Sequence, residues 1–105
     1  MQYCDQGKFL ENVVLLELLS RDYEVFVGKT YRGEVDFIAT KNDRKCFIQV
    51  ALTMEQQETI EREFKAFSSI KDGSPKYVLS LDKVDMSHDC ITHFNVIDFL
   101  FGKVE

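Results

Sequence analysis

Two acidic residues lie in a short apolar segment near the middle of the chain, at a spacing that could serve metal chemistry. Glu34 and Asp36 are two residues apart in GEVDFIA, and the next apolar segment, KCFIQVALT, carries a lone amide, Gln49. Because side chains alternate along a β-strand, both carboxylates are predicted to project from one face, with Val35 and Phe37 on the other. Paired carboxylates repel each other, so they are expected at the surface or around a cation.

A third acid, Glu11, lies in a segment with helical spacing of apolar residues, and its neighbours three, four and seven positions later are apolar. A buried carboxylate needs a partner, which could be a shared divalent cation or an arginine such as Arg32. Oxygen ligands from Glu11, Asp36 and Gln49, with Glu34 nearby, suit Mg²⁺. Such an ion stabilises charge that develops on a phosphodiester. The alternative is a solvated pair of strand acids and a salt bridge at Glu11.

The elements that would position these residues follow from the apolar periodicity and from turn residues. The helix over 7–23 has little polar face, so we expect it to lie against a sheet and to be covered on its other sides too. A turn at Asn42 and Asp43 favours an antiparallel meander. A second helix, with Thr53 as N-cap and Gly73 at its end, carries an apolar stripe of Ile60, Phe64, Phe67 and Ile70. The predicted strands cover 23–29, 34–40, 45–53 and 76–82, the second helix covers 54–73, and a short edge strand runs into a terminal helix over 90–102.

This order predicts an α/β (or α+β) domain with a mixed central sheet of about four to five strands and flanking helices, in the order αβββαβ plus a short strand and helix. The chain has 105 residues, of which 45% are hydrophobic and 30% are charged, as expected of one small globular domain. No apolar run could cross a bilayer and the first residues do not form a signal peptide, so a cytoplasmic protein with no membrane partner is expected.

The net charge and the cysteines and histidines narrow the function classes. A formal net charge of −5 disfavours tight binding of DNA by this chain alone, since that affinity comes largely from Lys and Arg at phosphates. Clustered basic residues or a partner domain could still supply it. Cys4, Cys46 and Cys90 are far apart and odd in number, which favours reduced thiols over a disulfide or zinc site. His88 and His93 each stand alone, as surface or hydrogen-bonded core histidines commonly do.

The ordered set of segments resembles a known fold and, more narrowly, a known family. A helix acid, a strand Asp and then (Asp/Glu/Gln)-x-Lys on the next strand is the order of the PD-(D/E)XK, or restriction-endonuclease-like, fold of Holliday-junction resolvases and many restriction enzymes. The segments that resemble the C-terminal domain of unknown function in a family of AAA-type ATPases are GKFLENVVLLELLSRDYEVFVGK, GEVDFIA, FIQVALT, ETIEREFKAFSSIKDGSPKYVLSLD and ITHFNVIDFL. The resemblance covers nearly the whole chain and implies one nuclease-like domain over residues 1–105. ATP would bind only to an N-terminal ATPase module, since the chain has no Gly-x-x-x-x-Gly-Lys-(Ser/Thr) loop.

Carried over residue by residue, the nuclease motif assigns Glu11 as the helix acid, Asp36 as the central metal ligand and Gln49 in place of the second acid. The departure is Ala51, which stands where the catalytic lysine belongs. That lysine orients the attacking water and stabilises charge on the phosphate, and losing one such group costs about 10²–10³ in rate. Lys65, on the following helix, is the candidate for a migrated lysine.

Three functions follow as alternatives. The first is a degenerate nuclease-fold accessory domain of an AAA-type ATPase, which engages DNA or a protein partner. The second is an active Mg²⁺-dependent DNA endonuclease that uses Glu11, Asp36, Gln49 and a displaced lysine. The third is a purely structural or oligomerisation module whose acids are solvated. Ala51 favours the first, and we expect the three metal-ligand candidates to converge at one end of the sheet.

Overall fold

The computed structural model describes residues 6–30, 33–68, 70, 73–87 and 90–102, and the side chains of 28–30 and 33–34 lie outside the described part. The expectations for Cys4, Arg32 and His88 therefore fall outside the described residues. The elements, in chain order, are α1 (Gln6–Ser20), β1 (Glu24–Thr30), β2 (Gly33–Lys41), β3 (Arg44–Val50), α2 (Gln57–Lys65), β4 (Lys76–Ser80), β5 (Ile91–Asn95) and α3 (Val96–Leu100).

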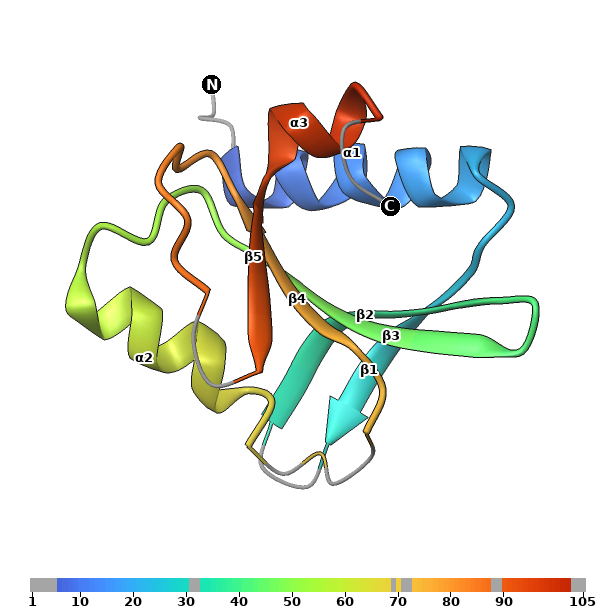
Figure 1. The fold of residues 1–105 in the computed structure, drawn as a ribbon, viewed down its shortest axis with the longest axis horizontal. Coiled ribbons are helices and arrows are strands. Elements are labelled where there is room, and N and C mark those ends of the chain that lie inside the picture. Colours follow the sequence, from blue (N-terminus) through green and yellow to red (C-terminus); the bar gives the residue numbers. More distant parts are fainter. Residues whose placement is uncertain (1–5, 31–32, 69, 71–72, 88–89, 103–105) are drawn as a thin grey trace, which may run out of the picture.

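The five strands form one mixed sheet in the order β1-β2-β3-β4-β5 (Figure 1). The first three strands pair antiparallel as a meander, whereas β3–β4 and β4–β5 pair parallel. The turn between β2 and β3 holds Asn42 and Asp43 at φ of 54° and 65°, in the left-handed region expected for both. The predicted mixed α/β fold and its order of elements are confirmed.

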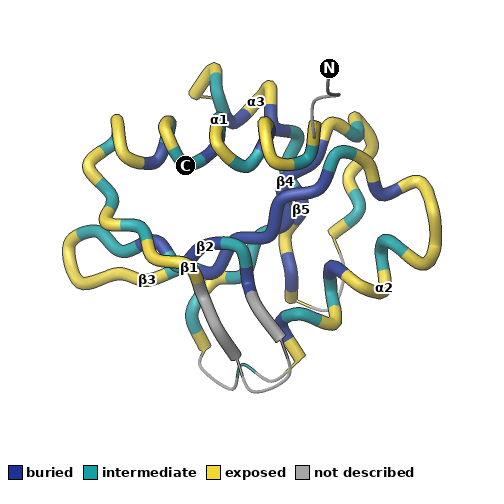
Figure 2. Tube along the Cα trace, turned by 180° about the vertical axis from the view of Figure 1, so that it is seen from behind, coloured by how far each residue is buried: buried dark blue, intermediate teal, exposed yellow. Residues whose placement is uncertain are grey.

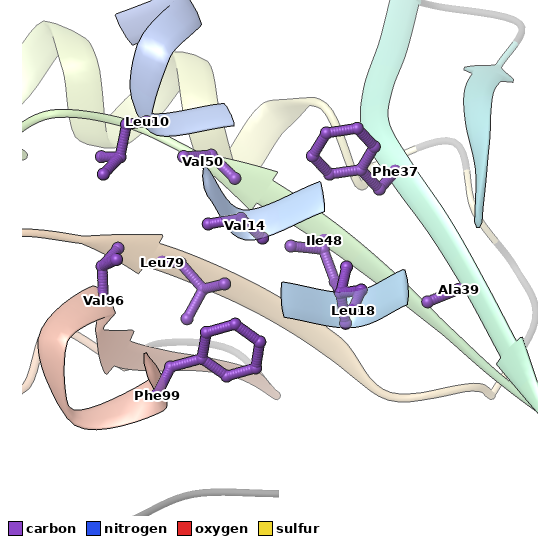
Figure 3. Packing of buried hydrophobic residues seen from close by; sticks show 10 residues of the cluster. All are labelled: Leu10, Val14, Leu18, Phe37, Ala39, Ile48, Val50, Leu79, Val96 and Phe99. Atoms are coloured by element: carbon purple, nitrogen blue, oxygen red, sulfur yellow. The ribbon is translucent and has the colours of Figure 1, made fainter. Parts of the chain in front are cut away.

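Helices cover both faces of the sheet, with α1 and α3 on one face and α2 on the other (Figure 1). Burial is concentrated along the middle of the sheet (Figure 2). The α1-side core, drawn in Figure 3, consists of Leu10, Val14, Leu18, Phe37, Ala39, Ile48, Val50, Leu79, Val96 and Phe99. The α2-side core consists of Val35, Phe47, Ala51, Met54, Phe67, Val78 and Ile91.

A β-bulge interrupts β2 at Asp36. The register with β1 shifts between Phe26 and Gly28, so that Asp36 and Phe37 together lie opposite a single residue of β1. One extra residue reverses the alternation of faces, and Val35 therefore packs in the α2-side core while Phe37 packs in the α1-side core. The expectation that these two side chains share a face is wrong for this reason.

The second helix is shorter than the periodicity predicts. Its N-cap is Gln56, which makes no side-chain capping bond, and the helix ends at Lys65 rather than at Gly73. The Thr53 hydroxyl instead donates to Asp82 Oδ1 at 2.9 Å, so a tertiary contact replaces the predicted cap. The apolar stripe is confirmed, since Phe67 is buried and the other members pack against the α2-side core.

The outer face of α1 is exposed, contrary to the expectation that this helix is covered on its other sides. Phe9, Leu16 and Leu19 are 66%, 65% and 47% exposed, and we call these three residues the α1 outer stripe. A helix that is apolar all round is normally enclosed.

Within the described residues, no helix is long and apolar enough to span a membrane.

Candidate functional site

The candidate site lies where β2 and β3 separate. Their backbone pairing ends at Phe37 and Ile48. Beyond that pair, side chains take over the bonding: the Asp36 N–H donates to Gln49 Oε1 at 2.5 Å, and the Val50 N–H donates to Asp36 Oδ2 at 2.8 Å. The fork between the strands is thus closed by the two side chains that the strand pattern singled out, and the structure brings Asp36 and Gln49 together.

Glu63 on α2 completes this group and is not among the residues predicted from the sequence. The Gln49 amide nitrogen donates to Glu63 Oε1 at 2.9 Å, and both residues are only 7% exposed. We call Asp36, Gln49 and Glu63 the fork cluster. The sequence did carry a signal, because Glu63 lies three residues after Ile60 and four before Phe67, on the apolar stripe itself. A carboxylate at such a position is buried and needs a partner.

The electrostatics of the fork cluster disfavour negative charge on Glu63. Burial raises the pKa of this carboxyl, and the nearby Asp36 carboxylate raises it further. Arg62, whose exposed guanidinium lies 3.5 Å from Glu63 Oε2, and the Gln49 amide oppose the shift without cancelling it. A proton or a bound cation would relieve this cost.

Two of the metal-ligand candidates, Asp36 and Gln49, already make hydrogen bonds within the protein. The Gln49 oxygen accepts the Asp36 N–H and its nitrogen donates to Glu63, so one of the two lone pairs of this oxygen is already used within the protein. Ala51 is buried on the same side of the sheet, among α2-side core residues, and supplies no charge. Across the described ranges, no three His, Cys, Asp or Glu side chains are grouped as a metal ion would require.

The remaining candidates are not all placed. Glu11 is half-buried on α1, which covers the face of the sheet opposite to α2. The side chain of Glu34 lies outside the described part of the chain. Lys65 is exposed at the last residue of α2. The convergence of Glu11 with Asp36 and Gln49, and the role of Lys65 as a migrated lysine, therefore stay predictions.

A second polar group joins β4, β5 and the loop between them, and it contains the residue types of a hydrolytic triad. The Ser80 hydroxyl lies 2.7 Å from His93 Nε2 and 2.6 Å from Asp82 Oδ2. The Met86 N–H donates to His93 Nδ1 at 3.2 Å. We call Ser80, Asp82 and His93 the serine–histidine cluster.

The directions of these bonds differ from those of a catalytic triad. Because Nδ1 accepts from Met86, the neutral imidazole carries its proton on Nε2 and donates to Ser80, whose hydroxyl donates to Asp82. In a catalytic triad the histidine accepts from the serine and is oriented by the carboxylate. Ser80 is also fully buried. The cluster is a structural tie, and His93 is a hydrogen-bonded core histidine.

The pKa shifts in this cluster favour its present protonation state. Burial lowers the pKa of His93, against the opposing carboxylates of Asp82 and Asp85, and so keeps the imidazole neutral. Burial alone would raise the pKa of Asp82, but hydrogen bonds from Ser80, Thr53 and Met54 bring it below its ordinary value. The carboxylate is thus stabilised where it lies.

The fold and the fork cluster define a small mixed α/β domain with a buried carboxylate–amide–carboxylate group at a strand fork. Residues 6–99 match the domain of unknown function (DUF4143), and the chain belongs to that family. An uncharacterised protein of Haemophilus influenzae is 36% identical over 92 residues, which are 87% of this chain but 22% of that protein. The chain therefore spans about a fifth of the length of the relative it matches. This family membership is consistent with the resemblance to domains that follow an ATPase module.

Proposed function

We propose that this chain is an accessory domain of a longer AAA-type ATPase protein, with a restriction-endonuclease-like fold whose nuclease site is degenerate, and that it acts by binding another protein. The order of the elements and the strand fork at Asp36 and Gln49 support the comparison with that fold. The matching relative is several times longer than the chain, which supports a role as one domain among others.

One observation carries the loss of catalysis: the Gln49 amide is bonded on both sides within the protein. A metal-dependent nuclease keeps carboxylate oxygens open for the ion and a lysine beside them for the attacking water. Here the amide links Asp36 to Glu63, and Ala51 occupies the lysine position. The residues that would bind metal instead hold a strand fork and a helix together.

The surface favours a protein partner over DNA. The net charge of −5 opposes the phosphate backbone. The α1 outer stripe offers an apolar surface of the kind that protein interfaces bury at their centre. A purely structural or oligomerisation role would use the same stripe, with a second copy of the chain as the partner, and sedimentation of the isolated chain distinguishes the two.

The test restores the second acid and the lysine that the nuclease motif has at positions 49 and 51. Calorimetry should detect no tight binding of Mn²⁺ to the parent chain, whereas the double variant Gln49→Glu/Ala51→Lys should bind Mn²⁺ at least about tenfold more tightly, since a carboxylate replaces an amide. Asp36→Ala in the double variant is the matched control and should remove the gain. A double variant that folds but binds Mn²⁺ no better than the parent would contradict the site assignment.

An active Mg²⁺-dependent endonuclease is the second candidate, and the raised pKa of Glu63 is the observation that favours it. Two carboxylates held close together, one with a raised pKa, are typical of a site that a cation completes. On this reading the parent chain cleaves DNA in the presence of Mg²⁺, and either Glu63→Gln or Lys65→Ala stops the reaction. Cleavage that both substitutions abolish would replace the first proposal with this one.

A further inference from the structure

A groove of about 530 Å³ opens on the α1/α3 face of the sheet, away from the fork cluster. Its floor includes buried members of the α1-side core, namely Leu18, Ala39, Ile48, Leu79 and Phe99 (Figure 3). The volume lies within the range of sites that hold small organic molecules. None of the fork-cluster residues lines it, so the groove is independent of the proposed nuclease-like site.

The walls of the groove are aromatic and half-buried. Tyr23 lines it, and so do Tyr77 and Phe94, whose ring centroids are 5.4 Å apart. Cys46 lines it as well, and burial raises the pKa of its thiol, so the thiol stays neutral and adds no charge. Such walls suit a flat or aliphatic body with little polarity.

Cations gather at the rim, although the chain as a whole is acidic. Arg44 and Lys45, both exposed, are the cations among the described residues that line the groove. Asp43 is the one carboxylate among the described lining residues. Among the described contacts, the Arg44 guanidinium makes no hydrogen bond or ion pair, so its donors are available to a ligand.

We propose that this groove binds a small organic anion, with its apolar body against Ile48 and Leu79 and its carboxylate, sulfonate or phosphate against Arg44. The apolar floor supplies affinity through buried area, and the cation selects the charged form of the ligand over its neutral analogue. The volume of about 530 Å³ fits a single medium-chain or aromatic acid.

Two cysteines allow a direct test with the whole chain. In a Cys4→Ser background, Cys46 reports on the groove and the exposed Cys90 serves as an internal control. Octanoate should slow alkylation of Cys46 by N-ethylmaleimide and leave the rate at Cys90 unchanged. Octanol, the neutral analogue, should need about three to ten times the concentration for equal protection, as expected for one partly exposed charge contact.

Charge reversal separates binding in the groove from non-specific association. Arg44→Glu should weaken protection by octanoate about three- to tenfold and leave protection by octanol unchanged. Lys83→Glu makes the same charge change at an exposed residue outside the groove and should leave both unchanged. If octanoate and octanol protect equally in the parent and in Arg44→Glu, the anion assignment is overturned. If neither compound protects Cys46, the groove is not a binding site.

Discussion

The fork cluster and the serine–histidine cluster are both built from carboxylates and neutral polar groups, yet they shift pKa values in opposite directions. Hydrogen bonds from three donors lower the pKa of Asp82. At the fork, burial and a neighbouring carboxylate raise the pKa of Glu63. The first cluster stabilises the charge of Asp82, whereas the second disfavours a charge on Glu63.

The difference separates a structural tie from a candidate site. A triad of residue types, Ser, His and Asp, is structural here because each hydrogen already has its acceptor. The less familiar carboxylate–amide–carboxylate group is the one in which a ligand would relieve a cost. In this protein, the direction of proton donation and the sign of the pKa shift therefore distinguish a structural group from a candidate ligand site better than residue type does.

The largest expected effect is at Asp82. Replacing Asp82 with Ala removes the acceptor of the Ser80 and Thr53 hydroxyls and of the Met54 N–H, and should lower the free energy of unfolding by about 2–4 kcal/mol. Urea denaturation gives the value. Asp85→Ala is the control and should have a much smaller effect, since in the described part of the structure this exposed carboxylate accepts hydrogen bonds only from Ser87. If both variants lose the same free energy of unfolding, the hydrogen bonds to Asp82 do not have the stabilising role assigned to them.

At the fork, Gln49→Glu should place a third carboxylate against Asp36 and Glu63 and lower the free energy of unfolding by about 1–3 kcal/mol. Millimolar Mn²⁺ should restore part of the loss, because a ligand that binds only the folded state stabilises it. The exchange Gln49→Glu/Glu63→Gln keeps one amide beside one carboxylate and should be close to the parent. An exchange variant as unstable as Gln49→Glu would refute the role assigned to charge.

Acid should weaken the serine–histidine cluster, because its histidine is held neutral in the folded state. The pKa of His93 in the folded state is below its unfolded value of about 6.5, so its contribution is present above that pH and is lost as the pH falls through the folded value. Asp82 and Asp85 face the ring and oppose this loss in part. Urea midpoints measured from about pH 7 to about pH 5 should fall in the parent. The fall should be shallower in His93→Gln, and an unchanged slope would exclude His93 as its cause.

The smallest effect is expected for Glu63→Gln. The pKa of Glu63 is raised in the folded state, so its carboxylate destabilises the fold once the pH exceeds the folded value, and an amide removes that cost. The substitution should raise the free energy of unfolding at about pH 8 by less than about 1 kcal/mol, with a smaller difference at about pH 5. Asp82→Asn, the same chemical change in the other cluster, should destabilise at both pH values. If Glu63→Gln lowers the free energy of unfolding as much as Asp82→Asn does, the proposed difference between the two clusters is wrong.

Regular periodicity explains what the sequence could predict. Alternation and turn chemistry gave the meander, the left-handed turn at Asn42 and Asp43, and the proximity of Asp36 to Gln49, because adjacent strands of a hairpin have a defined register. The mixed sheet followed from the order of the elements. The meander, the turn and the contact between Asp36 and Gln49 each depend on residues that are close in sequence.

The features that the sequence could not predict are a local irregularity in a strand and contacts between residues that are distant in the chain. The β2 bulge reverses the faces of Val35 and Phe37, and no local pattern marks the inserted residue. Thr53 donates to the Asp82 carboxylate, which is distant in sequence, and does not cap the nearby helix α2. Glu63 was detectable as an acid on an apolar stripe, but its partner on another element was not.

The change from antiparallel to parallel pairing at β3 has a kinetic consequence. The β1–β2 and β2–β3 pairs close across short connections, whereas β4 can join β3 only after the whole crossover through α2 has been brought back. Short loops close faster and lose less chain entropy. We therefore expect the hairpin that carries Asp36 and Gln49 to form early, and the contact from Gln49 to Glu63 to form late. The carboxylates of the fork then meet only near the end of folding, when the repulsion between them can least delay the search for the native sheet.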